Sequence, residues 1–104
     1  MTENRVTLSG RVARAPKNSV SPAGIPHCQF WLEHRSQQLE AGFSRQAYCY
    51  MAVALSGELH KQVTQQVTMG CDVKVMGFIH QHRQVSGESR LVLHAQQIEL
   101  LSRG

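Results

Sequence analysis

An alternation of apolar and polar residues with a period of two recurs along this chain. Between Val6 and Val12 the apolar or glycine positions are separated by single polar residues. A period of two is typical of a β-strand with one buried face, because successive side chains point to opposite sides. The same pattern predicts five strands in all, over residues 6–12, 25–36, 43–55, 73–80 and 90–101.

The alternation also assigns side chains to faces. The second strand places Trp31 and Arg35 opposite its apolar set, and the third places Tyr48 and Tyr50 opposite its own. The apolar sets are predicted to face the core, which leaves the aromatic residues on the outer faces. The predicted core sets are Cys28, Phe30, Leu32 and His34 in the second strand, and Ala47, Cys49, Met51, Val53 and Leu55 in the third.

Turn-forming and polar residues mark the breaks between strands. Residues 18–24 and 37–42 are predicted to be loops, and residues 82–89 are predicted to form a long hairpin tip. Two glycines, Gly10 and Gly77, lie inside strand patterns instead. Both fit the bends of a barrel, where a strand interior lacks a side chain.

One segment has a different period. Within residues 57–69 a spacing of four between Leu59, Val63 and Val67 indicates a short amphipathic helix. Five strands with a helix between the third and the fourth predict an OB-fold, a Greek-key barrel, in a single domain of residues 1–104. An SH3-like barrel or a small sandwich would also give five alternating strands.

The charge of the chain favours an acidic partner. The 104 residues include 11 Lys and Arg against 7 Asp and Glu, which gives a formal charge of +4. A basic excess favours polyanions such as nucleic acids. No apolar stretch approaches the ~20 residues that a membrane span requires, and residues 1–8 lack the apolar segment of a signal peptide. A cytoplasmic protein is therefore expected.

Catalytic and metal-binding motifs are absent from the sequence. The acidic residues are scattered, and there is no Gly-rich phosphate loop, pair of carboxylates or nucleophile elbow. We expect neither an enzyme nor a cofactor. His80, His82 and His94 could meet on paired strands, which makes a zinc site geometrically conceivable. The three cysteines form no CxxC pair and the histidines have no HxxxH spacing, so no metal site is expected.

Long blocks of the sequence carry a resemblance to a known family. Residues 21–30 read SPAGIPHCQF, residues 32–36 read LEHRS, residues 41–43 read AGF, and residues 93–100 contain LHA and QIEL. These blocks closely resemble the family of primosomal replication protein N, a relative of bacterial single-stranded DNA-binding protein. The resemblance implies an OB-fold homodimer that binds single-stranded DNA in replication restart. It also implies a bridge between that DNA, the restart helicase and the next loading protein.

Aromatic and basic residues supply what such a protein needs. OB-folds that bind single strands combine aromatic faces for bases with a basic groove for phosphates. By the resemblance, Phe43 and Tyr48 match aromatic positions of the DNA-binding face, with tyrosine at 48 replacing a common tryptophan. Arg35 and Arg45 flank them. The predicted DNA-binding residues are Arg14, Lys17, Arg35, Phe43, Arg45, Tyr48, Arg83 and Arg90.

Several features leave alternatives open. In the hairpin of residues 82–89 the resemblance implies lysines, but Val85 stands where a lysine is expected and Glu88 adds a negative charge. A protein-interaction adaptor with weak nucleic-acid binding is therefore an alternative function. Trp31 and Tyr50 fit a core or a dimer interface as well as a DNA contact. A cold-shock-like RNA binder would have a denser aromatic cluster on the second and third strands.

Overall fold

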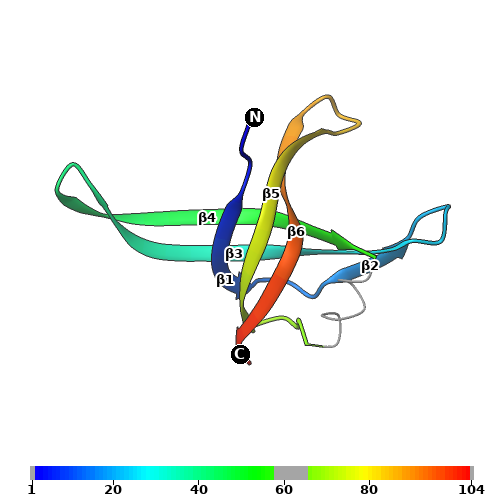
Figure 1. Cartoon of the computed structure of the whole chain (residues 1–104), viewed down its shortest axis with the longest axis horizontal. Coiled ribbons are helices and arrows are strands. Elements are labelled where there is room, and N and C mark those ends of the chain that lie inside the picture. Colours follow the sequence, from blue (N-terminus) through cyan, green and yellow to red (C-terminus); the bar gives the residue numbers. More distant parts are fainter. Residues whose placement is uncertain (1, 58–65, 104) are drawn as a thin grey trace.

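Six β-strands make up most of the described chain. The computed structural model describes residues 2–57 and 66–103 (Figure 1). The strands are β1 (Val6–Val12), β2 (Lys17–Val20), β3 (Pro26–Glu40), β4 (Phe43–Ser56), β5 (Asp72–Arg83) and β6 (Ser89–Ser102). The all-β class that the period of two predicts is confirmed.

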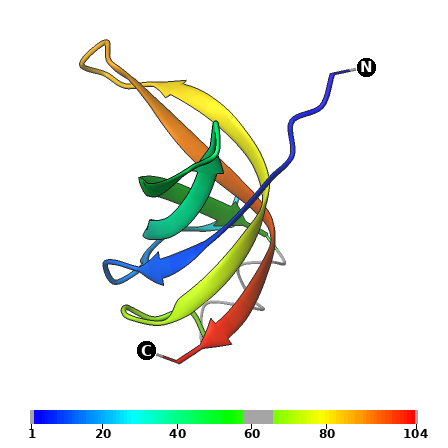
Figure 2. The ribbon, with the colours of Figure 1, turned by 90° about the vertical axis from the view of Figure 1, so that its left-hand side faces the viewer.

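The strands form one sheet whose pairings close on themselves. The order is β1-β5-β6-β4-β3-β2, and β1 pairs with β3 as well as with β5. The β4–β6 pairing is parallel, and the other pairings are antiparallel. Because β1 joins both sides, the sheet curls around a common interior (Figure 2).

The inward residues of the alternating strands meet in this interior. Val12, Leu32, Val53, Val75 and Leu93, from five different strands, are all fully buried. Burying a valine or leucine side chain contributes about 1.5–3 kcal/mol, so this set is a main source of stability. The predicted faces of the second and third strands are confirmed where they cross the core.

His34 belongs to the predicted core face, but it is only half-buried. Its Nδ1 lies 2.6 Å from the main-chain oxygen of Ser9, and its Nε2 lies 2.8 Å from the Ser36 hydroxyl. A carbonyl oxygen can only accept, so Nδ1 is the nitrogen that carries the proton. The two contacts give both nitrogens of the His34 ring a hydrogen-bond partner at the edge of the core.

Two glycines allow strands to approach closely. A Cβ at Gly10 would overlap the main-chain carbonyl of Glu33 in β3, and one at Gly77 would overlap that of His94 in β6. Gly77 adjoins a register shift in the β5–β6 pairing. Both glycines, predicted to mark bends, occupy positions that have no room for a side chain.

β3 and β4 continue past the core as a long two-stranded ribbon, which extends to the left in Figure 1. Pairing runs without interruption to Glu40 and Phe43, and the ribbon ends at Ala41 and Gly42. These two residues have φ values of 53° and 81°. Consecutive positive φ values are typical of a type I′ turn, whose twist matches that of the strands. The predicted loop over residues 37–42 is wrong except for this turn, because its polar residues pair in register.

Two other boundaries differ from the prediction. The predicted loop over residues 18–24 is wrong in its first part, because Lys17–Val20 form β2, paired with the start of β3. All four residues of β2 are exposed, so no buried face produces an apolar alternation. The predicted hairpin tip over residues 82–89 shortens to residues 84–88, because β5 continues to Arg83. The sheet therefore has six strands instead of the predicted five.

The predicted short helix over residues 57–69 falls mainly on residues 58–65, which lie outside the described residues. The flanking residues 66–69 have turn or irregular structure, and Val67 among them is buried in the core. Within the described parts of the chain, no helix has the length and apolar character that crossing a membrane requires.

Candidate nucleic-acid interface

The outward side chains of β3 and β4 form rows of paired positions along the ribbon. The antiparallel register places Arg35 opposite Tyr48 and Glu33 opposite Tyr50. Directly opposed residues on one face have Cβ atoms about 5 Å apart, so charged and aromatic groups lie side by side. Tyr48 is 53% exposed and Tyr50 is 41% exposed, which leaves both rings accessible from solvent.

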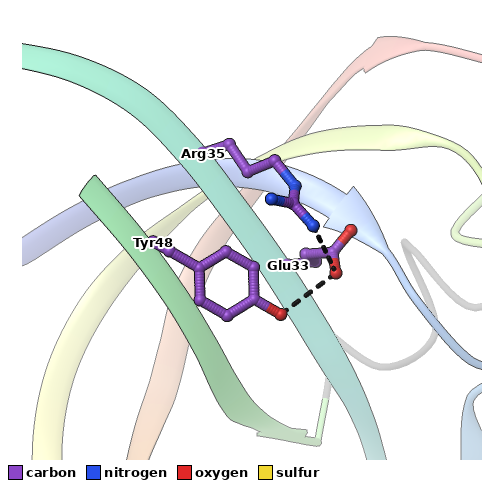
Figure 3. Close-up of polar contacts among 3 residues, drawn as sticks. All are labelled: Glu33, Arg35 and Tyr48. Atoms are coloured by element: carbon purple, nitrogen blue, oxygen red, sulfur yellow. Dashed lines mark hydrogen bonds and ion pairs between the residues drawn. The ribbon is translucent and has the colours of Figure 1, made fainter. Parts of the chain in front are cut away.

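Arg35 and Tyr48 contact each other directly. The guanidinium carbon of Arg35 lies 4.7 Å from the centre of the Tyr48 ring, within the range of a cation–π interaction. The Tyr48 hydroxyl donates a hydrogen bond of 3.1 Å to Oε2 of Glu33. The same oxygen lies 3.6 Å from Nη2 of Arg35 (Figure 3). Glu33 therefore orients both side chains on the outer face.

Glu33 is not among the predicted site residues. Desolvation is the largest cause that raises the pKa of the Tyr48 hydroxyl. The hydrogen bond to Glu33 and the charge of that carboxylate raise it further. The hydroxyl therefore stays protonated and available as a donor. The sequence does contain a signal, since Glu33 lies two residues before Arg35 and so shares its face. Its negative charge opposes a phosphate approaching Arg35.

Phe43 and Arg45 lie at the far end of the ribbon. Phe43 is 69% exposed next to the turn, and Arg45 forms an exposed ion pair of 3.1 Å with Glu40. Strand alternation puts both on the face opposite to Tyr48. The structure therefore separates this pair from Arg35 and Tyr48, although the sequence places all four residues close together.

The remaining predicted residues gather at the other end of β3. Arg14 and Lys17, from the β1–β2 connection and β2, line a hollow together with Arg90 from β6. Arg90 and Arg83 also line a neighbouring hollow of about 550 Å³. The fold thus brings together cations that are more than seventy positions apart in the sequence. At the hairpin turn Val85 is fully exposed.

The chain resembles known proteins along most of its length. Residues 4–97 match the model of a family described as another single-strand binding protein family. The replication restart protein PriB of Erwinia tasmaniensis is 57% identical over 104 residues, covering 100% of this chain and 99% of that protein. The chain belongs to the PriB family of single-strand binding proteins. The resemblance to primosomal replication protein N, the same restart family, is confirmed.

Solved structures show that the fold of this PriB family member is shared more widely. The protein priB of Ralstonia solanacearum has a TM-score of 0.78 at 23% identity, covering 95% of this chain and 98% of that one. A deletion mutant of the single-stranded DNA binding protein of Thermus aquaticus has a TM-score of 0.82 at 20% identity, covering 96% of this chain and 51% of that one. These likenesses support the predicted OB-fold. The matched family and the Thermus aquaticus protein are both described as binding single strands.

A histidine cluster adjoins the basic residues of this PriB family member. The Nε2 atoms of His82 and His94 lie 2.8 Å apart, so one nitrogen donates a hydrogen bond and the other accepts it. The His80 ring meets His82 edge-on at 4.6 Å between ring centres, and His94 stacks on Phe78 at 5.0 Å. In residues 2–57 and 66–103, no three His, Cys, Asp or Glu side chains are arranged to hold a metal ion.

Acidification is expected to destabilise the fold through His94. Burial lowers the pKa of His94, and positive charge on His82 and His80 lowers it further. The unfolded chain therefore binds the proton more tightly than the folded protein. The contribution to stability is present above the ordinary His pKa of about 6.5 and is lost as the pH falls from that value through the lowered pKa of the folded protein.

Thermal melts above and below that pH measure this effect. The fall in Tm on acidification should be smaller in His94→Gln, because the amide still forms hydrogen bonds but does not titrate. An equal fall in both proteins would show that His94 is not responsible.

Proposed function

We propose that this PriB family member binds single-stranded DNA in replication restart. The observation that carries the proposal is the exposed Arg35–Tyr48 pair on the outer face of β3 and β4. A ring on which a base can stack, beside a cation for phosphate, is the combination that single-strand binding proteins use without sequence preference. The names of the relatives, a replication restart protein and a single-stranded DNA binding protein, support it.

The other predicted residues extend this contact in two directions. At the ribbon end, on the opposite face, Phe43 would stack a second base and Arg45 would exchange Glu40 for a phosphate. An exposed ion pair contributes only about 0–1 kcal/mol, so this exchange is easy. At the opposite end, the cations of the β1–β2 connection, β2, β5 and β6 would hold further phosphates. The complete proposed set is Arg14, Lys17, Arg35, Phe43, Arg45, Tyr48, Arg83 and Arg90.

We infer further properties from the family. The closed circuit of strand pairings would be an OB-type barrel in a single domain. The protein would work in the cytoplasm as a homodimer and would bridge DNA, the restart helicase and the loading protein.

Exposed apolar residues away from Tyr48, such as Leu39 and Leu101, are 80% and 50% exposed and favour association with another chain. Sedimentation at micromolar concentration should give a dimer, and a clean monomer of 11.6 kDa would contradict this.

Titration of a labelled oligo-dT over a range of salt concentrations tests the proposal. Single strands should bind much better than duplex, because stacking requires an exposed base face. Affinity should fall steeply with salt, and Arg35→Ala should flatten the slope of log K against log salt by about 0.7, the value for one single-strand phosphate contact. Arg103→Ala, a cation outside β3 and β4, is the matched control and should leave the slope unchanged. Equal affinity for duplex and single strand would contradict the proposal.

The adaptor function is the second candidate. It is favoured by the carboxylate of Glu33 between Arg35 and Tyr48, and by the uncharged Val85 at the hairpin turn. An adaptor would bind its protein partner with little response to salt and would bind oligo-dT weakly. The same salt titration separates the two functions.

A further inference from the structure

A hollow of about 290 Å³ lies where β2, β3, β4 and β6 meet, away from the Arg35–Tyr48 pair. Trp31 and Ala52 face each other across the β3–β4 pairing and form part of its lining. Ala52 is four residues from Tyr48 along β4, which is about 14 Å at 3.4 Å per residue. The hollow is therefore a separate place on the same outer face. The lining residues are Arg14, Ala15, Lys17, Gln29, Phe30, Trp31, Ala52 and Arg90.

An aromatic surface borders this hollow. The rings of Trp31 and Tyr50 stack with 4.8 Å between centres and 9° between planes. The stack leaves one face of the indole uncovered by Tyr50. The guanidinium carbon of Arg90 lies over the Trp31 ring at 5.5 Å from its centre. That spacing is within the range of a cation–π contact, and the long, exposed arginine side chain can leave the ring without disturbing the core.

The charge of the hollow is of one sign. Arg14, Lys17 and Arg90 are all exposed, and no carboxylate lies among the lining residues. In the part of the chain that the structure describes, none of the three forms an ion pair. By contrast, Arg35 lies 3.6 Å from Glu33, and Arg45 lies 3.1 Å from Glu40. A phosphate entering the hollow therefore displaces no internal carboxylate.

We propose that this hollow binds one nucleotide of a single strand, with the base stacked on Trp31 and the phosphates contacted by Arg14, Lys17 and Arg90. The base takes the place of the Arg90 guanidinium over the indole, and Arg90 turns to a phosphate. The subsite rests on the proposed function and adds to it a further stacking position, distinct from Tyr48 and Phe43. Tyr50 holds the indole in place from its other face.

Fluorescence of the protein tests this subsite directly. Trp31 is the sole tryptophan of the chain, so indole emission reports on this position alone. An oligo-dT of about 15 nucleotides, on the scale of an OB-fold site, is added to saturation while a labelled copy follows binding by anisotropy. Stacking of a base on Trp31 should quench the emission in proportion to the bound fraction.

Variants supply an independent readout. Trp31→Ala should weaken binding of the labelled strand by about 5- to 160-fold, the range for loss of one stacked base. Trp31→Phe keeps a ring and should stay much closer to the wild-type affinity. Lys17→Ala should flatten the salt slope by about 0.7. Circular dichroism melts identify any variant that fails to fold. The quenching measurement uses the wild-type protein, so it does not depend on the folding of the variants.

Three results would overturn the subsite. If the labelled strand binds while Trp31 emission is unchanged and Trp31→Ala keeps the wild-type affinity, the subsite is wrong and the proposed function stands. If no single strand binds, both are wrong. If Trp31→Ala sediments as a monomer while the wild type is a dimer, and the emission of the wild type is not quenched, Trp31 belongs to a subunit interface.

Discussion

Gly77→Ala is expected to lower the free energy of unfolding by about 3 kcal/mol or more, because an added Cβ would overlap the main-chain carbonyl oxygen of His94. The overlapping oxygen belongs to the main chain, so it cannot move away by a change of side-chain rotamer. Separating β5 from β6 would break ladder hydrogen bonds and displace Val75 and Leu93 from the core. Urea unfolding followed by circular dichroism measures the loss.

The matched control for this substitution is Gly87→Ala in the hairpin turn. Gly87 has a φ of 90°, and nothing lies within 4 Å of the place that a Cβ would occupy there. Replacing Gly87 with alanine creates no overlap. It only puts a residue with a Cβ into a positive-φ backbone conformation, which costs about 1 kcal/mol of stability. Equal losses in the two variants would show that the close approach of β5 and β6 at Gly77 is not what limits stability.

Tyr48→Ala is expected to weaken binding of single-stranded DNA by about 1–3 kcal/mol, the range for removal of one stacked base. The ring is 53% exposed and makes its polar contact with Glu33 on the outer face, so its loss should leave the core intact. Because stacking does not depend on counterions, the loss should be similar at low and high salt. Anisotropy of a labelled oligo-dT at two salt concentrations provides the measurement.

Tyr48→Phe separates stacking from the hydrogen bond. It keeps the ring and removes the hydroxyl that donates to Glu33. If stacking is the main contribution, Tyr48→Phe should bind nearly as well as the wild type. Unchanged binding by Tyr48→Ala, or loss of the fold, would show that the platform is elsewhere on the molecule.

The sequence predicts those parts of the fold in which a strand has one buried face. The alternation around Phe30, Leu32 and Val53 reflects burial against the core, and the structure buries all three. The placement of Arg35 beside Tyr48 also follows from alternation, once the hairpin brings the two strands into register. In such strands the period of two identifies both the core and the outer face.

Elements without a buried face carry no such signal. β2 is exposed along its length, and the end of the β3–β4 ribbon is held by pairing and by its turn instead of by apolar contacts. Alternation alone puts Phe43 and Arg45 on the face opposite to Tyr48, and the length of the ribbon carries them beyond the core. The hollow beside Trp31 depends on segments near residues 14, 31 and 90, whose meeting is a consequence of sheet order.

The outer face of β3 and β4 is proposed to bind single-stranded DNA. A map of amide chemical-shift changes on adding an oligo-dT of about 15 nucleotides tests it most directly, because it reports on every strand at once. We expect the largest changes at Trp31, Arg35 and Tyr48 and in the hairpin around Arg83 and Arg90. Changes confined to β1 and residues 66–71, with none on β3 and β4, would contradict it.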